Sequence, residues 1–252
     1  MMKTVVFDFD GTIHNSKRLY GSAFRKGYEW LVSKGYAEPA FYSDDDVSKY
    51  LGMTAPEMWQ SFMPQLPRSV TEEAGSIIGR QETEDILGGK AVMYSGVSDA
   101  LTLLKQSGWS LMILSNCHHS YMDAHRQALG LDRWFDDYFC GEDYGFIPKE
   151  DIFTFIMQKY PSELFVMIGD RRSDIAAGIK NGVPTVGCLY GFGSPEELAQ
   201  ASCTVSSPDE LFPAITSIFE NVKKAAALYR SAAAFSAHYI MHPEEYFPAQ
   251  VE

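Results

Sequence analysis

Short runs of β-branched, aliphatic and aromatic residues recur along the chain, and each stops abruptly at a polar side chain. Runs of this length and composition are typical of buried β-strands. Each of these strands therefore ends at a side chain that can take part in binding or catalysis. The runs cover residues 4–7, 110–114 and 164–168, and they end at Asp8, at Ser115 and at Gly169-Asp170.

Helical patterns lie between and after these runs, and most of them close at a glycine. Strands that alternate with helices predict parallel βαβ units. The predicted fold class is therefore α/β, a doubly wound parallel sheet, in which ligands bind beyond the carboxyl ends of the strands. The helical patterns cover residues 97–106, 122–129, 149–159 and 175–180.

The pattern changes between Thr12 and about Lys90, where helical periodicity continues without strands. This predicts an inserted all-helical domain within the α/β core. A further strong helix, including residues 221–235, follows after about Ser207. The predicted divisions are a core formed by residues 1–14 and 91–215, an inserted helical domain over 15–90, and a C-terminal helical extension over 216–252.

Composition narrows the class of protein. Of the 252 residues, 46% are hydrophobic and 21% are charged, which is typical of globular proteins, and no segment approaches the roughly 20 unbroken apolar residues of a membrane helix. The apolar run near the start is too short for an export signal, and the four cysteines form no CxxC pair. We expect a cytoplasmic protein with reduced thiols. A formal net charge of −12 argues against nucleic acid as a partner.

Asp8 and Asp10 form the first candidate site. On a regular strand their spacing places both carboxylates on one face, and Gly11 lets the backbone approach a ligand closely. Two carboxylates so close repel each other unless a cation joins them, and Mg²⁺ commonly binds one or two carboxylates together with a substrate phosphate. Asp170 and Asp174 form a second acidic pair after another strand. Either pair alone is more often a helix cap or a solvated surface.

Two further strand or helix ends supply polar groups. Ser115 and Asn116 follow a strand and could hold phosphate oxygens, although a capping role is the commoner one for such a serine. Lys149 follows Pro148 and opens a helix, where a single lysine is usually a solvated charge. The value of these signals lies in their order along the chain.

That order makes a family resemblance specific. The sequence Asp8-Phe9-Asp10-Gly11-Thr12 resembles the first motif, D-x-D-G-T, of the haloacid dehalogenase superfamily. Ser115 matches the serine or threonine of motif II, Lys149 the lysine of motif III, and Asp170 with Asp174 the GDxxxD pattern of motif IV. In many relatives a proline follows the motif III lysine, whereas here it precedes Lys149.

The resemblance spans residues 3–212 and also indicates a branch of the superfamily. Residues 189–194 and 196–198 are similar to phosphoglycolate phosphatase-like members, and an all-helical insert directly after motif I resembles the helical cap of that branch. By this resemblance the chain is a phosphohydrolase that acts on a small phosphorylated molecule, such as a phosphoglycolate-like compound, a sugar phosphate or a nucleotide.

The resemblance also implies catalytic roles. Asp8 would be the nucleophile that forms an aspartyl-phosphate, and Asp10 the general acid to the leaving group and then the base to water. Ser115 and Lys149 would hold the phosphoryl oxygens. Mg²⁺ and Lys149 would offset the repulsion between a phosphate dianion and an anionic nucleophile.

The implied metal ligands are Asp8, the backbone carbonyl of Asp10, and Asp170. Asp174 would either bind the metal directly or contact one of its ligands. Substrate contacts are expected from Gly11 and Asn116 in the core. In the cap, Met53 and Thr54 are the expected location for specificity, because cap loops rather than the core set it in this superfamily.

Several alternatives share part of this pattern. The superfamily's dehalogenases lack the second aspartate of motif I, and its phosphonoacetaldehyde hydrolases need a cap lysine that residues 51–55 do not supply. A phosphomutase shares all four motifs and stays open. A non-catalytic binding protein on this fold would have lost motif acids, all of which are present, and a receiver domain would lack the helical insert.

Two other features are open to more than one interpretation. His118 and His119 are adjacent, so on a helix their side chains diverge, which argues against one shared metal. The apolar stripe of the C-terminal helix, which includes Ala225 and Leu228, must be covered. It either docks on the chain's own core or forms a dimer contact, so a monomer and a homodimer both stay possible.

Overall fold

The structure is a computed structural model that describes residues 2–241. The chain divides into two compact units, with the division between Phe212 and Pro213. Helix α9 (Leu211–Met241) contains the predicted helix over 221–235, and the end of the predicted C-terminal extension, residues 242–252, lies outside the described residues. Within residues 2–241 no helix is long and apolar enough to cross a membrane.

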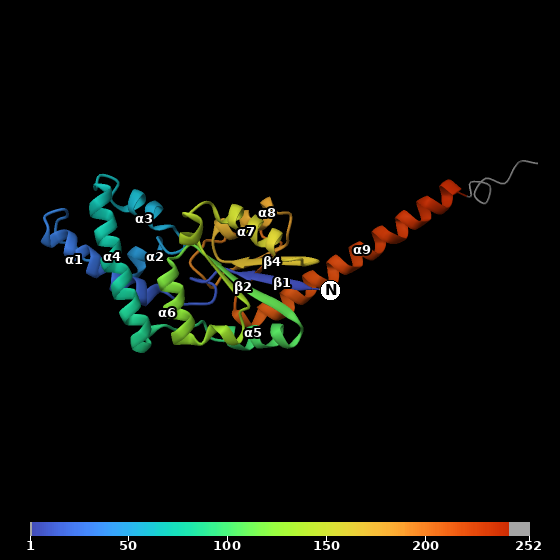
Figure 1. Ribbon diagram of the computed structural model, residues 1–252, viewed down its shortest axis with the longest axis horizontal. Helices are drawn as coiled ribbons and strands as arrows, with labels where there is room; N and C mark the ends of the chain where they lie inside the picture. The colour runs from blue at the N-terminus through green and yellow to red at the C-terminus, as the bar shows by residue number, and fades with distance from the viewer. Residues whose placement is uncertain (1, 242–252) are drawn as a thin grey trace, which may run out of the picture. The chain divides into compact units, whose positions relative to one another are not determined.

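Six parallel strands form the sheet of the first unit, in the order β3-β2-β1-β4-β5-β6 (Figure 1). This order reverses direction at β1, which pairs with β2 on one side and with β4 on the other. The crevice between the carboxyl ends of β1 and β4 is the place where doubly wound sheets bind ligands. The strands are β1 (Lys3–Phe7), β2 (Trp109–Ser115), β3 (Asp137–Cys140), β4 (Leu164–Gly169), β5 (Thr185–Cys188) and β6 (Cys203–Val205).

Helices cover both faces of the sheet, as the predicted doubly wound fold requires (Figure 1). On one face, Phe153 and Ile156 of α7 and Ala177 of α8 pack with Val6 and Met167 of the central strands. Figure 1 shows α5 on the opposite side. The helices are α5 (Val97–Gln106), α6 (His119–Leu129), α7 (Lys149–Lys159) and α8 (Arg172–Lys180), with short 3₁₀ turns at Leu131–Arg133, Gly141–Tyr144 and Pro208–Glu210.

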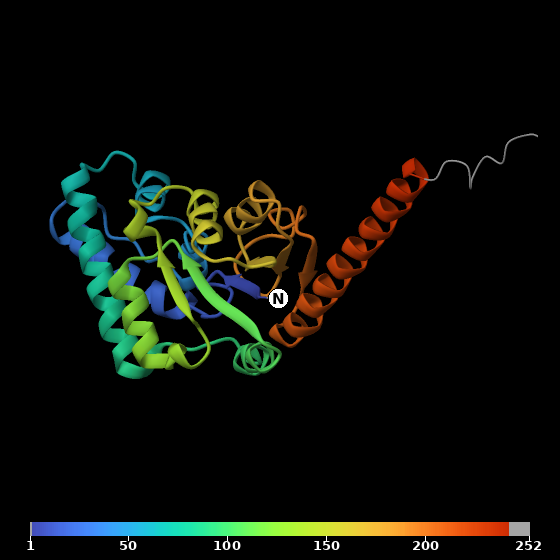
Figure 2. The same ribbon diagram turned by 45° about the vertical axis from the view of Figure 1, so that its right-hand side comes forward.

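The chain between β1 and β2 is helical and has a core of its own. Helices α1 and α4 lie side by side (Figures 1 and 2), and Phe24, Leu31, Trp59 and Ile78 belong to one buried cluster. The predicted inserted helical region is therefore present, although its exact boundaries stay a prediction. It comprises α1 (Lys17–Ser33), α2 (Asp44–Ser48), α3 (Ala55–Phe62), α4 (Arg68–Asp85) and a π-helical turn at Ile86–Lys90.

Candidate active site

The parallel pairing of β1 with β4 brings two acidic loops together. Phe7 lies in register with Ile168, and the backbone N–H of Asp8 donates to the carbonyl of Ile168 at 2.8 Å. Asp8 and Asp170 therefore leave adjacent strands at the same edge of the sheet. Asp170 and Asp174 are fully buried and Asp8 nearly so, which carboxylates tolerate only with charged or hydrogen-bonding partners.

Lys149 provides one such partner. Its Nζ lies 2.6 Å from Oδ1 of Asp8 and 2.6 Å from Oδ1 of Asp174, and its side chain is buried. Burial lowers the pKa of Lys149, but the two carboxylates outweigh burial and hold the pKa above its usual value. Lys149 is the first residue of α7, with Pro148 as its N-cap, so a proline before the lysine is compatible with an inward-facing ammonium group.

One ammonium does not balance the cluster, because three buried carboxylates surround it. Oxygen atoms of Asp8, Asp170 and Asp174 all lie within 4.8 Å of one another, and Oδ2 of Asp8 is buried without a hydrogen-bond partner. Burial and the neighbouring Asp174 raise the pKa of Asp170 to about 7. A hard dication with oxygen ligands fits this donor set and would relieve the excess negative charge.

The loops around Asp170 leave no room for larger side chains. Gly11 has a φ of +85°, and a Cβ there would lie 2.3 Å from Oδ2 of Asp170. A Cβ at Gly191 would lie 2.3 Å from the Cβ of Asp170, and the Phe192 N–H donates to Oδ2 of Asp170 at 2.6 Å. Glycine at both positions thus lets the loop after β1 and the loop after β5 close on the same carboxylate.

The Asp10 side chain has different partners. Its Oδ1 accepts hydrogen bonds from the Tyr121 hydroxyl at 2.7 Å and from His14 Nδ1 at 3.0 Å. Because a carboxylate only accepts, His14 carries the proton on Nδ1 in this contact. Burial raises the pKa of Asp10, but His14 and Tyr121 outweigh it and leave the pKa below its usual value.

Sequence reasoning missed these two partners of Asp10. His14 is fully buried four residues after Asp10, and Tyr121 reaches it from α6, 111 residues away in sequence. The His125 ring lies 4.3 Å from the His14 ring and 4.4 Å from that of Tyr121, and its Nδ1 donates to the Tyr121 carbonyl at 3.0 Å. The one sequence signal for the cluster of His14, Tyr121 and His125 is His14 itself, which follows motif I by two residues.

The predicted phosphate-holding residues lie at the end of β2. Ser115 is the last residue of that strand and is buried. Asn116 donates from Nδ2 to the carbonyl of Gly52 at 3.2 Å, while its Oδ1 is buried without a partner. Asn116 therefore links the strand end to the helical insert, where the Arg171 guanidinium also donates to the carbonyl of Leu51.

The two predicted cap residues differ in their surroundings. Met53 lines a cavity of about 1270 Å³ next to Asp10 and Asn116. Thr54 does not line it: its hydroxyl caps α3 by accepting from the Glu57 N–H at 3.4 Å and donating to Glu57 Oε2 at 2.8 Å. The substrate role of Thr54 stays a prediction, and the capping box accounts for its burial.

The two adjacent histidines have separate partners. His118 pairs with Glu142 through Nδ1 at 2.9 Å, whereas His119 lies 3.2 Å from Asp123 and 3.5 Å from Asp143. His119, Cys140 and Asp143 form a second group of potential ligand atoms, but His119 and Asp143 are exposed. The buried carboxylate cluster is the better candidate for a catalytic cation.

Comparison with known families agrees with the motif order. The model of the haloacid dehalogenase-like hydrolases matches residues 2–182, and a HAD-hydrolase-like model matches residues 147–218. Together these matches include every motif residue named above. The first match alone covers more than half of the chain.

Curated relatives carry phosphatase names. A phosphoglycolate phosphatase from Pasteurella multocida is 29% identical over 48% of this chain and 54% of its own length, so that match spans about half of the relative. The enzyme from Neisseria gonorrhoeae is 25% identical over 88% of this chain and 94% of its own. A pyrophosphatase, PpaX, from Listeria monocytogenes is 24% identical over 78% and 88%.

Solved structures share the fold. A predicted phosphatase from Clostridium acetobutylicum superposes with a TM-score of 0.74 at 23% identity, covering 86% of this chain and 99% of its own. A predicted phosphoglycolate phosphatase from Haemophilus somnus superposes with a TM-score of 0.72 at 19% identity, covering 85% and 98%. The α/β fold, predicted from the alternation of strands and helices, is thus confirmed, as are the phosphoglycolate phosphatase-like branch and the phosphohydrolase enzyme that the family resemblance implied. The chain belongs to the haloacid dehalogenase-like hydrolases.

Proposed function

We propose that the protein is a Mg²⁺-dependent phosphatase that hydrolyses a small-molecule phosphate ester through an aspartyl-phosphate intermediate. The observation that carries this proposal is the buried cluster in which Lys149 bridges Asp8 and Asp174 beside Asp170. A nucleophilic carboxylate, a fixed ammonium group and a set of cation ligands are what phosphoryl transfer to an aspartate requires.

In the first half-reaction, an oxygen of Asp8 attacks the phosphorus atom and the bond from phosphorus to the ester oxygen breaks. Asp10 donates a proton to that oxygen, and the alcohol leaves. Oδ1 of Asp10 holds the hydrogen bonds from Tyr121 and His14, so Oδ2 is the oxygen that is left to exchange the proton.

In the second half-reaction, Asp10 removes a proton from a water molecule, and the water oxygen attacks the phosphorus of the aspartyl-phosphate. The bond between phosphorus and the Asp8 oxygen breaks, which releases inorganic phosphate and restores both carboxyl groups. The low pKa that the Tyr121 and His14 hydrogen bonds give Asp10 keeps it ionised before turnover. Asp10 must therefore gain its proton when the phosphoryl group is bound.

The residues proposed to contact the cation and the phosphate lie at the same edge of the sheet. Asp8, Asp170 and the backbone carbonyl of Asp10 would hold Mg²⁺, with Asp174 in its surroundings. When bound, Mg²⁺ would withdraw charge from the phosphoryl oxygens. Lys149, Ser115 and Asn116 would hold those oxygens, with Gly11 allowing close approach of the backbone.

We also propose that the enzyme works in the cytoplasm on small molecules, without nucleic acid or membrane partners, as a monomer or homodimer. The four cysteines are free, and Cys140 and Cys188 among them are buried, which suits a reducing compartment. The substrate classes supported by the names of the relatives are phosphoglycolate-like esters and pyrophosphate.

A phosphatase screen tests the proposal directly. Phosphoglycolate, sugar phosphates, nucleotides, pyrophosphate and acetyl phosphate are each incubated with Mg²⁺ or with EDTA, and released phosphate is measured. We expect Mg²⁺-dependent release from at least one compound and none from an Asp8→Asn variant. Transfer of phosphate between two positions of a sugar without its release would instead identify a phosphomutase, and no turnover of any compound would contradict the proposal.

A further inference from the structure

The cavity that opens beside Asp10 is large for the substrate of a phosphoglycolate phosphatase. Its volume is about 1270 Å³, and it extends from Asp10, Asn116 and Cys117 to helices α3 and α4 of the insert. Sites for drug-sized ligands typically have volumes of about 300–1,000 Å³. Glycolate contributes a single methylene and a carboxylate beyond the phosphoryl group, so it would leave most of this cavity unfilled.

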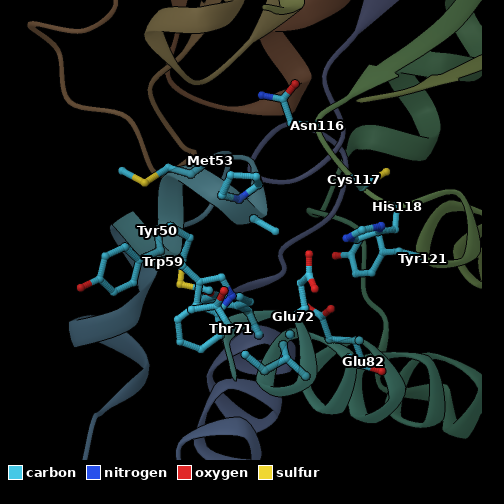
Figure 3. A pocket seen from close by; sticks show the side chains of 18 of the residues that line it. Tyr50, Met53, Trp59, Thr71, Glu72, Glu82, Asn116, Cys117, His118 and Tyr121 are labelled. Carbon is cyan, nitrogen blue, oxygen red and sulfur yellow. The ribbon is translucent and has the colours of Figure 1, made fainter. Parts of the chain in front are cut away.

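The far wall of the cavity is apolar and aromatic. Tyr50, Met53 and Trp59 lie on one side, opposite Cys117 and Tyr121 from the sheet domain (Figure 3). Aromatic rings and methionine thioethers bind apolar groups, and aromatic groups in particular, through large contact areas. This wall matches a leaving group with an apolar body.

The basic side chains that line the cavity are exposed to solvent, and each already has one partner. Nε of Arg68 donates to Oε1 of Glu72 at 2.7 Å, and His118 pairs with Glu142 at 2.9 Å. Arg80 is exposed and donates to the Ser76 hydroxyl. A substrate carboxylate or second phosphate would therefore find no buried cation among the described lining residues.

Acidic residues outnumber these cations. Glu72, Glu82 and Glu84 line the cavity together with Asp10. Among the described residues none forms an ion pair with Glu82, and burial together with the nearby charges of Asp10 and Asp85 raises its pKa to about 8. With this pKa Glu82 is mostly protonated at pH 7 and adds no negative charge, so an anionic leaving group would meet the Asp10 carboxylate without a buried cation among the described lining residues to offset it.

We propose that the substrate is a phosphomonoester whose alcohol carries an apolar body of at least one aromatic ring and no second anionic group. Trp59 and Met53 would contact that body, and the described lining residues offer no buried cation to hold an anionic alternative such as phosphoglycolate. This inference rests on the proposed phosphatase function, and it narrows the substrate class that the names of the relatives suggest.

Two matched substrates test whether the site disfavours a second anionic group. Benzyl phosphate and para-carboxybenzyl phosphate have the same reacting oxygen and differ in one remote carboxylate. We expect kcat/KM to be at least about tenfold higher for benzyl phosphate, and higher also than for phosphoglycolate.

A second comparison tests the apolar wall. Trp59→Ala should lower kcat/KM for benzyl phosphate about tenfold but reduce that for methyl phosphate much less, because methyl phosphate does not reach the wall. Trp59 belongs to the core of the insert, so its variant is checked by thermal melting. Met53→Ser, at a partly exposed position, gives the same comparison if the Trp59 variant does not fold.

The outcomes separate this inference from the function on which it rests. Mg²⁺-dependent hydrolysis of phosphoglycolate or carboxybenzyl phosphate with kcat/KM equal to or above that of benzyl phosphate overturns the substrate class and leaves the phosphatase function standing. No Mg²⁺-dependent hydrolysis of any of these esters or of acetyl phosphate overturns both.

Discussion

The Tyr121 hydroxyl donates a 2.7 Å hydrogen bond to Oδ1 of Asp10, and this contact joins α6 to the loop after β1. The same oxygen accepts from His14, so two donors fix the plane of one carboxylate. The orientation of a general acid matters most when the leaving group is a poor one, because transfer of the proton to the leaving oxygen must then be well advanced in the transition state.

We therefore expect Tyr121→Phe to slow the hydrolysis of an alkyl phosphate by about tenfold, and that of p-nitrophenyl phosphate much less. The nitrophenolate ion leaves without a proton, so it does not depend on the acid. Steady-state kcat/KM for the two substrates is the measurement, with the exposed Tyr36→Phe as control. An equal loss on both substrates would mean that Tyr121 acts only through the stability of the site.

A second prediction concerns Asp8. Asp8→Asn conserves volume but removes the attacking oxygen anion, so turnover should fall by at least about three orders of magnitude. Burial raises the pKa of Asp8 well above its usual value, which means that its charge costs stability in the metal-free protein.

The variant should therefore melt at the same temperature as wild type or higher when both are kept in EDTA. Circular dichroism melts and phosphate release measure the two effects on one preparation. Asp99→Asn, at an exposed residue in the first turn of α5, serves as the control and should keep full activity. Turnover within tenfold of wild type in Asp8→Asn would remove Asp8 from the nucleophile position.

Metal dependence gives a third prediction. EDTA should abolish activity and Mg²⁺ should restore it, whereas Ca²⁺ should restore little, since its looser and higher coordination misplaces the nucleophile. Mg²⁺ should also raise the melting temperature of the wild type, and raise it less in Asp170→Asn, because Asp170 is one of the three clustered carboxylates. Full activity in a metal-free preparation is the contrary result.

The fold could be predicted from sequence where a strand is a continuous apolar run or where a helical pattern extends over several turns. The central strands β1, β2 and β4 are runs of buried apolar residues, and their ends carry the motifs. Strands β3, β5 and β6 were missed because they are three or four residues long and mix apolar with polar or small residues. Their pairing with longer strands, rather than their own composition, makes them strands.

Only some residues of the candidate site could likewise be predicted from the sequence. Asp8, Lys149, Asp170 and Asp174 could be named because motif order in a doubly wound sheet predicts convergence at one edge. Tyr121 could not be, since its contact with Asp10 depends on how α6 packs, and no local pattern encodes that. The cap was the weakest part of the prediction, because its cavity is formed by side chains from several helices and loops.

The last prediction concerns Lys149, whose ammonium group is the one buried basic group of the described residues that lies within ion-pairing distance of both Asp8 and Asp174. Lys149→Met keeps an unbranched apolar stem but leaves these carboxylates without a cation. Breaking a buried ion pair by removing one partner costs about 3–5 kcal/mol, so the free energy of unfolding in EDTA should fall by about that amount. Lys180→Met, which removes an exposed pair with Asp151, should cost less than about 1 kcal/mol.

The pH dependence of that loss distinguishes charge from packing. Burial and Asp174 raise the pKa of Asp170 to about 7, so this acid binds its proton more tightly in the folded protein than in the unfolded chain. Its ionisation destabilises the fold, and the destabilisation is relieved as pH falls through the folded pKa. Lys149 lowers that pKa in the wild type, so in Lys149→Met the acid binds its proton still more tightly. The free energy of unfolding of the variant should therefore recover more than that of the wild type when the pH is lowered from about 8 to about 6. Denaturant titrations in EDTA at the two pH values measure this recovery. A loss of stability that is the same at both pH values would mean that the methionine disturbs packing, and that the charge balance of the cluster does not depend on Lys149.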